Sequence, residues 1–209
     1  MRVLVACEFS GRVRDAFLKR GHDTISCDLL PTESPGSHYQ GDVFDIIDDG
    51  WDLMIAHPPC TYLSKAGARW LHQGGTINKQ RYEKGLEAKE FFLKLLNANI
   101  PRIAIENPTP LKIYELPKHN QTIQPYMFGH PFSKRTLLWL KNLPKLKPTE
   151  VIKNYFPFLP SNTGGKKRGQ QYSFGVSKSS KESSTTFKGV ADAMAEQWGK
   201  ILVDGEKTW

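Results

Sequence analysis

Short, mostly apolar runs that suit buried strands alternate with helical segments through the first half of the chain. The runs are residues 2–7, 24–29, 53–56 and 103–105. Residues 78–97 carry apolar side chains at a period of about 3.6 with charges between them, which is typical of a helix. The connections are long enough for crossovers, so the pattern predicts an α/β fold with a mainly parallel central sheet flanked by helices.

Three further elements are expected. A helix that starts at Gly11 has apolar side chains at helical spacing, and Gly21 marks its C-terminal end. Residues 136–140 form another apolar run typical of a strand, and residues 189–202 have the pattern of a closing helix. A length of 209 residues suits one domain with a full core.

Three polar side chains stand at or just beyond the ends of predicted strands: Asp28, Cys60 and Glu106. In sheets of this type, ligands bind outside the carboxyl ends of the strands. We therefore expect these three side chains to converge on one cleft.

The chain is basic, with a formal net charge of +8 and an isoelectric point near 9.3. This excess favours an anionic partner, of which nucleic acid is the commonest, although a basic surface without a specific partner is an alternative. There is no apolar run of membrane-spanning length and no secretory pattern at Met1, so we expect no membrane contact and a cytoplasmic location. The histidines have no paired metal-ligand spacing, so no metal is expected.

The composition changes between residues 144 and 188. Nine Lys or Arg residues face two acidic ones there, and tyrosines and phenylalanines lie between them. A basic loop with aromatic side chains can hold phosphates and stack bases, whereas a loosely packed insertion is an equally open interpretation. We expect residues 1–143 and 189–209 to form one domain, with 144–188 as an insertion.

Cys60 differs from the other two cysteines. Cys7 and Cys27 lie in apolar strands, where a thiol usually serves as a small buried hydrophobe, and three widely spaced cysteines argue against a disulfide framework. Cys60 follows Pro58 and Pro59, which fix the backbone before it, and its neighbours are polar. This context favours a reactive thiol at a rigid turn.

Glu106 follows a buried strand directly, in the sequence Ile-Ala-Ile-Glu-Asn-Pro. A carboxylate with a purely structural hydrogen bond would explain this position. The functional interpretation is a carboxyl group in a partly dry cleft that shares a proton with a ring nitrogen.

The order and spacing of these residues resemble the motif series of cytosine-C5 DNA methyltransferases. The motif residues are Phe9-Ser10-Gly11, Asp28, Gly41-Asp42-Val43, Pro58-Pro59-Cys60, Glu106-Asn107 and Arg135. The resemblance covers most of residues 1–140, and residues 189–198 resemble the closing helix of that family.

The resemblance implies a Rossmann-like class I methyltransferase fold, S-adenosylmethionine as cofactor and nucleic acid, DNA foremost, as partner. It implies that Cys60 attacks C6 of cytosine, that Glu106 hydrogen-bonds the N3/N4 edge and that Arg135 helps to hold a base flipped from the duplex. The resemblance assigns Phe9, Gly11, Asp28, Asp42, Val43 and Pro58 to the cofactor, and Asn107, Thr61 and Lys134 to the substrate.

The chain departs from the family pattern in three places. Arg12, Val13 and Arg14 stand where the family carries further glycines, so Arg12 or Arg14 could pair a carboxylated analogue of the cofactor. Thr61 replaces a usual glutamine, and His57 replaces a small residue, where it could crowd or hydrogen-bond the loop. Only residues 144–188 are available as a target-recognition domain, which leaves relaxed specificity, single strands, a protein partner or a free nucleotide open.

Two other classes of function remain as alternatives. The same C5 chemistry could act on RNA or a free nucleotide, and a non-catalytic nucleic-acid-binding module could use the same fold. The pair of Cys60 and Glu106 argues against a binding-only module. An amino-methyltransferase would need an aromatic residue in place of Cys60.

Overall fold

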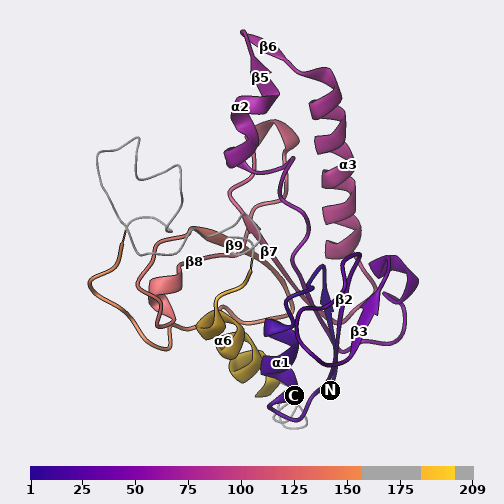
Figure 1. The fold of residues 1–209 in the computed structure, drawn as a ribbon, viewed down its shortest axis with the longest axis vertical. Helices are drawn as coiled ribbons and strands as arrows, with labels where there is room; N and C mark the ends of the chain where they lie inside the picture. Colours follow the sequence, from indigo (N-terminus) through magenta and orange to yellow (C-terminus); the bar gives the residue numbers. More distant parts are fainter. Residues whose placement is uncertain (157–184, 201–209) are drawn as a thin grey trace.

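The computed structural model describes residues 1–156 and 185–200, and a seven-stranded sheet forms its centre (Figure 1). The strands lie in the order β3-β2-β1-β4-β7-β9-β8. Their bounds are Arg2–Ala6 for β1, Asp23–Asp28 for β2, His38–Gln40 for β3, Leu53–Ala56 for β4, Arg102–Pro108 for β7, Gln121–Ile123 for β8 and Thr136–Lys141 for β9. The strands from β3 to β7 pair in parallel, and β9 runs antiparallel to both of its neighbours.

This topology confirms the predicted fold class. The chain begins in the middle of the sheet at β1, builds outward to β3, and then returns to build the other half from β4. The antiparallel strand β9, inserted between β7 and β8, completes a Rossmann-like sheet. The place where β1 adjoins both β2 and β4 is the switch point at which such sheets bind ligands.

Helices cover both faces of the sheet. Helices α1 (Arg12–Leu18) and α6 (Lys188–Gly199) pack together on one face, and α3 (Lys79–Leu96) covers the other (Figure 1). Because side chains alternate along a strand, Val3 and Val5 of β1 face the α1 and α6 side, while Leu4 and Ala6 face α3. Both sets are fully buried, and accordingly β4 and the part of β1 after Arg2 contain only apolar residues.

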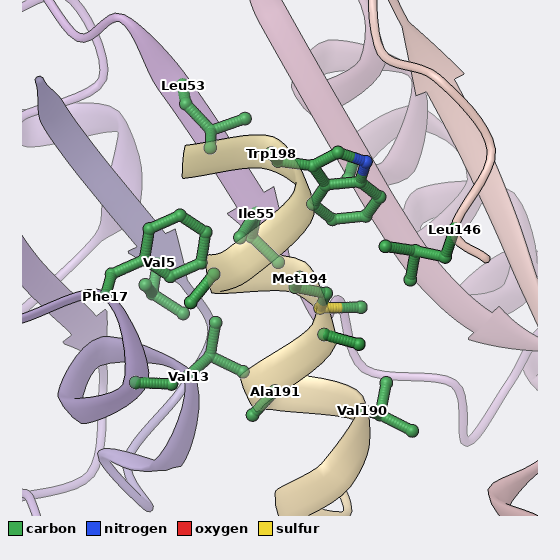
Figure 2. Packing of buried hydrophobic residues seen from close by; sticks show 14 of the residues in the cluster. Val5, Val13, Phe17, Leu53, Ile55, Leu146, Val190, Ala191, Met194 and Trp198 are labelled. Carbon is green, nitrogen blue, oxygen red and sulfur yellow. The ribbon is translucent and has the colours of Figure 1, made fainter. Parts of the chain in front are cut away.

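The closing helix fills the first face of the core. In Figure 2, Met194 and Trp198 of α6 lie against Leu53 and Ile55 of β4. The indole Nε1 of Trp198 donates a hydrogen bond to the carbonyl of Pro144 at 3.0 Å, so the start of the basic segment is anchored to this helix. Helix α6 begins one residue before the predicted start at 189, while the predicted end at 202 lies outside the described residues.

The predicted buried face of α3 is partly wrong. The apolar period of the sequence places Leu86, Phe91, Leu95 and Leu96 on one face; Leu95 is buried, but Leu86 is 37% exposed, and Gly85 and Phe92 are buried as well. The reason is Tyr114, whose ring packs so close to Gly85 that an added Cβ would lie 2.1 Å from it. The glycine therefore faces inward, and its neighbour Leu86 turns outward.

Several short elements were not predicted. Strands β3 and β8 have three residues each, and the segment after Cys60 contains a short helix, α2 (Ala68–Leu71), and a hairpin of β5 (His72–Gln73) and β6 (Thr76–Ile77). Four short 3-10 turns complete the described chain: Val43–Asp45, Lys65–Gly67, Lys112–Tyr114 and Pro125–Met127. Most of the expected insertion, residues 157–184, lies outside the described residues, so the domain division stays a prediction.

The described residues include no helix with the length and apolar character that a membrane crossing requires.

Truncation of Trp198 tests how far the sheet depends on α6. The side chain is 1% exposed, so Trp198→Ala should lower the free energy of unfolding by about 3–5 kcal/mol, through lost burial and the cavity left behind. Urea titration followed by circular dichroism measures this loss. Trp70 is 51% exposed, and Trp70→Ala is the matched control that should shift the free energy by no more than about 0.5 kcal/mol.

Candidate active site

A two-part cleft lies at the carboxyl ends of β1, β2 and β4. One cavity of about 220 Å³ has apolar walls that include Val43 and Phe91, with Asp42 at its side. The adjoining cavity, of about 260 Å³, has a more polar wall. Its lining residues are Cys7, Glu8, Phe9, Ser10, Asp28, Leu30, His57, Pro59, Thr185 and Thr186. Cys7, Asp28 and Pro59 line both cavities, so the two form one continuous cleft.

Four of the six predicted cofactor residues line this cleft. Asp28, Asp42 and Val43 line the first cavity, and Phe9 and Asp28 line the second. These residues lie together because each one ends a strand or follows it closely, and the carboxyl ends of these strands lie at the same edge of the sheet. The side chain of Asp42 also accepts a hydrogen bond from the amide of Phe44, which starts the 3-10 turn at Val43.

Gly11 and Pro58, the other two predicted cofactor residues, are buried away from the cleft walls. Gly11 has a φ of +72°, and an added Cβ would lie 2.5 Å from a guanidinium nitrogen of Arg14. Its lack of a side chain therefore makes room for Arg14. Pro58 accepts a long hydrogen bond of 3.5 Å from the side-chain amide of Asn107, and its neighbour Pro59 lines the cleft instead.

The structure argues against Arg14 as a ligand for a cofactor carboxylate. Arg14 is fully buried, and its guanidinium donates to Ser26, Thr32 and Asp15 side chains and to the carbonyls of Ser34 and Pro35, at 2.9 to 3.2 Å. Those bonds use all five of its N–H donors. The arginine ties the loop after β2 to helix α1, and the expectation that it pairs a ligand is wrong for this residue. Arg12 is exposed.

Glu8 was missed by sequence reasoning. Its buried carboxylate accepts hydrogen bonds from the amides of Val13 at 2.8 Å and Arg14 at 3.2 Å, and from the hydroxyl of Ser10 at 3.1 Å. It thus satisfies amide donors at the start of α1, where a negative charge is favoured. A carboxylate just after a buried strand was the signal that drew attention to Glu106, and the same signal was present here.

His57 and Glu106 form a hydrogen-bonded ion pair at the carboxyl ends of β4 and β7. The Nδ1–H of His57 donates to Oε2 of Glu106 at 3.0 Å, and each side chain is only 12% exposed. Burial lowers the pKa of His57, but the bond to Glu106 and the charges of Glu106 and Glu8 outweigh it, so the pKa lies above its ordinary value. Burial raises the pKa of Glu106, but the hydrogen bond to His57 and the charges of His57 and Lys134 outweigh burial, so the pKa lies below its ordinary value and the carboxylate form is favoured.

The second ring nitrogen of His57, Nε2, is buried and has no hydrogen-bond partner among the described residues, and the same holds for Oδ1 of Asn107. His57 also lines the second cavity of the cleft. An unsatisfied buried polar atom costs about 1–3 kcal/mol, so both atoms are suited to meet a ligand or an ordered water. Among the described residues, no three His, Cys, Asp or Glu side chains gather as a metal-ligand set.

Cys60 lies within electrostatic reach of this pair. Burial raises the pKa of its thiol, the negative charge of Glu106 raises it further, and Lys134 and the Ser64 side chain lower it. Burial, together with the negative charges of Asp28 and Asp42, raises the pKa of Cys27 to about 12 and that of Cys7 still further. Cys60 is therefore the most readily ionised of the three cysteines.

Of the remaining residues predicted to bind substrate, one lies beside Glu106 and two are exposed. Lys134 and Glu106 line one small cavity together, which places Lys134 beside the predicted catalytic groups. Arg135 is exposed, and Thr61 is exposed with its carbonyl accepting a hydrogen bond from Arg81 at 2.8 Å. Because Lys134 lines the cavity of Glu106 and Arg135 does not, Lys134 is better placed than Arg135 to meet a base beside Glu106.

Comparisons with known proteins found distant similarity in structure alone. No protein-family model and no curated protein matches the chain. It is similar to a prophage-encoded E. coli protein named as a DNA modification methyltransferase, with 12% identity over 77% of this chain and 56% of that one and a TM-score of 0.44. It is also similar to the Entamoeba histolytica methyltransferase EhMeth (16% identity, 76% and 57% covered, TM-score 0.43) and to a mutant of Spodoptera frugiperda DNMT2 (15% identity, 77% and 57% covered, TM-score 0.39). The chain spans little more than half the length of these structures.

Removing the charge of Lys134 should slow alkylation of Cys60. Since Lys134 lowers the pKa of this thiol, Lys134→Ala should leave less thiolate and reduce the rate with iodoacetamide at about pH 8 several-fold. Peptide mapping by mass spectrometry would follow Cys60 separately from Cys7 and Cys27. Lys134→Arg keeps the charge and should react at the wild-type rate; equal rates in all three proteins would contradict the assigned interaction.

The His57–Glu106 pair should leave a pH signature in stability. A raised His57 pKa stabilises the fold fully below its ordinary value of 6.5, and this stability is lost as pH rises through the folded pKa. On the acid side, the contribution of Glu106 is lost as pH falls through its lowered pKa. Melting temperatures measured from about pH 6 to 9 should show the alkaline loss in wild type and not in His57→Gln. The exposed His72→Gln variant is the control and should behave as wild type.

Proposed function

We propose that this chain is a methyltransferase that transfers a methyl group from S-adenosylmethionine to C5 of cytosine in DNA through a covalent adduct with Cys60. The observation that carries the proposal is the buried His57–Glu106 pair beside the cleft at the carboxyl edge of the sheet, with Cys60 directly after Pro59, which lines both cavities, and within reach of the charge of Glu106. A thiol nucleophile next to a hydrogen-bonding carboxyl group is the arrangement that addition to a pyrimidine ring requires.

The residues of the cleft fit the proposed cofactor. Val43 and Phe91 offer apolar surface to an adenine ring, Asp42 an acceptor for its amino group, and Asp28 an acceptor for ribose hydroxyls. Ser10 and the backbone near Phe9 line the other cavity, where the methionine part would lie. S-adenosylmethionine, when bound, supplies an electrophilic methyl group. Since Arg14 is saturated by protein groups and Arg12 lines neither cavity of the cleft, we propose the unmodified cofactor as the donor rather than a carboxylated analogue.

Cys60 would add to C6 of the cytosine as its thiolate. Glu106 would hydrogen-bond the N3/N4 edge and stabilise a protonated ring, so that electron density from the thiolate reaches C5, the atom that accepts the methyl group. Lys134 would help to hold the pyrimidine against these groups. Loss of the C5 proton to solvent, release of Cys60 as its thiolate and return of the N3 proton to Glu106 would then restore the aromatic ring.

His57 gives the proposed mechanism a source for the proton at N3. Glu106 is held as a carboxylate, so it cannot donate a proton from its resting state. The imidazolium of His57 donates directly to Glu106, which makes it the nearest stored proton in the site. We therefore assign to His57 the role of supplying, through Glu106, the proton that the ring nitrogen takes up when the thiolate adds.

DNA is proposed as the substrate because the chain is strongly basic and because its motif residues resemble those of DNA enzymes. A target in a duplex would have to be flipped into the site. RNA, a free nucleotide and a partner protein that selects the target remain as outcomes of the test rather than parts of the proposal.

Trapping with 5-fluorocytosine tests the function directly. Fluorine at C5 blocks the final elimination, so a DNA oligonucleotide that contains it should stay attached to Cys60 when S-adenosylmethionine is present. Intact mass after denaturation should rise by the mass of the methylated oligonucleotide. Cys60→Ala should form no adduct, and the same oligonucleotide with ordinary cytosine should leave none. If the protein binds the cofactor by calorimetry yet forms no adduct with single-stranded or duplex DNA, the DNA proposal fails.

A further inference from the structure

A groove outside the cleft lies beside the segment that follows Cys60. Its volume is about 230 Å³, and its lining residues are Tyr62, Trp70, Asn78, Gln80, Arg81 and Lys84. They come from the segment after Cys60, from α2 and from the start of α3, which project together beyond the sheet (Figure 1). The groove shares no lining residue with either cavity of the cleft.

Positive charge and aromatic rings are combined in this groove. The guanidinium of Arg81 lies 4.9 Å from the centroid of the Tyr62 ring, and the ammonium of Lys84 lies 5.7 Å from it. Arg81 is anchored by its bond to the carbonyl of Thr61, and none of the six lining residues is acidic. The groove therefore presents fixed cations without nearby lining groups to neutralise them.

Trp70 is the exposed aromatic surface of the groove. Its side chain is 51% exposed and belongs to neither core cluster, and Arg69 lies 4.8 Å from its ring centroid on the same short helix. An indole that is not used in the core, placed beside cations, is suited to stack an unpaired base while the cations meet the adjoining phosphates.

We propose that this groove binds one nucleotide of single-stranded DNA beside the target base, with the base stacked on Trp70 and the phosphate against Arg81 and Lys84. The inference rests on the proposed function in one respect, that a target base lies at Cys60. Tyr62 follows Cys60 by two residues in the chain, so in this proposal the nucleotide in the groove neighbours the one whose base lies at Cys60. Stacking requires an unpaired base, so the groove favours single strands over a closed duplex.

Binding of a labelled oligothymidylate of twelve nucleotides, measured by fluorescence anisotropy, tests the groove without a target cytosine. Trp70→Ala should weaken binding about tenfold, while Trp70→Phe should keep most of the affinity. Lys84→Ala should lower the slope of log K against log salt by about 0.7 between about 50 and 200 mM. Lys19→Ala removes an exposed lysine at the end of α1 and should leave the slope unchanged.

Three results would overturn the inference. The first is that Trp70→Ala binds oligothymidylate as tightly as the wild type, and the second is that Trp70→Ala loses as much affinity for a blunt duplex of the same length. The third is that the wild type binds the matching RNA more tightly than the DNA in a way that depends on Trp70. Circular dichroism and melting of each variant exclude unfolding as the cause of a loss. The fluorocytosine adduct separates the two proposals. Loss of oligothymidylate binding in Trp70→Ala without any wild-type adduct supports the groove and rejects the function, whereas an adduct with unchanged binding does the reverse.

Discussion

Burial of the sheet on both faces is the constraint on which the candidate site depends. Helices α1 and α6 cover one face and α3 the other, so polar groups have no place along the central strands. They stand at or beyond the point where parallel pairing ends, and parallel strands all end at the same edge. Glu8, Asp28, His57 and Glu106 are therefore gathered by the topology, although they come from or follow four different strands.

The gathered charges balance one another in a poorly solvated space. His57 is hydrogen-bonded to Glu106 and is also influenced by the charge of Glu8, and Lys134 adds a second cation near Glu106 and Cys60. In such surroundings the protonation of one group depends on its neighbours, and a proton can be held at His57 without a net charge being buried. The thiol remains mostly protonated at rest, which would limit reaction before a substrate enters.

The sequence pattern was enough to predict the central parallel strands, because short, continuous apolar runs are typical of buried strands. The edge strands β3 and β8, of three residues each, depend on pairing rather than on any period of their own. Cys60 and Glu106 were predicted as site residues from their positions at strand ends. The pair of His57 with Glu106 was not, because 49 residues separate them and only the sheet register brings them together. The choice between Lys134 and Arg135 depends on side-chain direction, which spacing alone does not give.

The start of α1 is built from residues that function only as a set. Glu8 satisfies the amides of Val13 and Arg14, the Arg14 side chain holds the loop after β2, and Gly11 leaves the space that this side chain fills. Substituting any one of these residues leaves a buried charge without its partner or creates a steric clash. Their contributions to the free energy of unfolding are therefore strongly coupled. Single substitutions toward a glycine-rich loop would each pass through a destabilised intermediate. This loop can therefore be replaced by a glycine-rich one without loss of stability only if several of its residues change together.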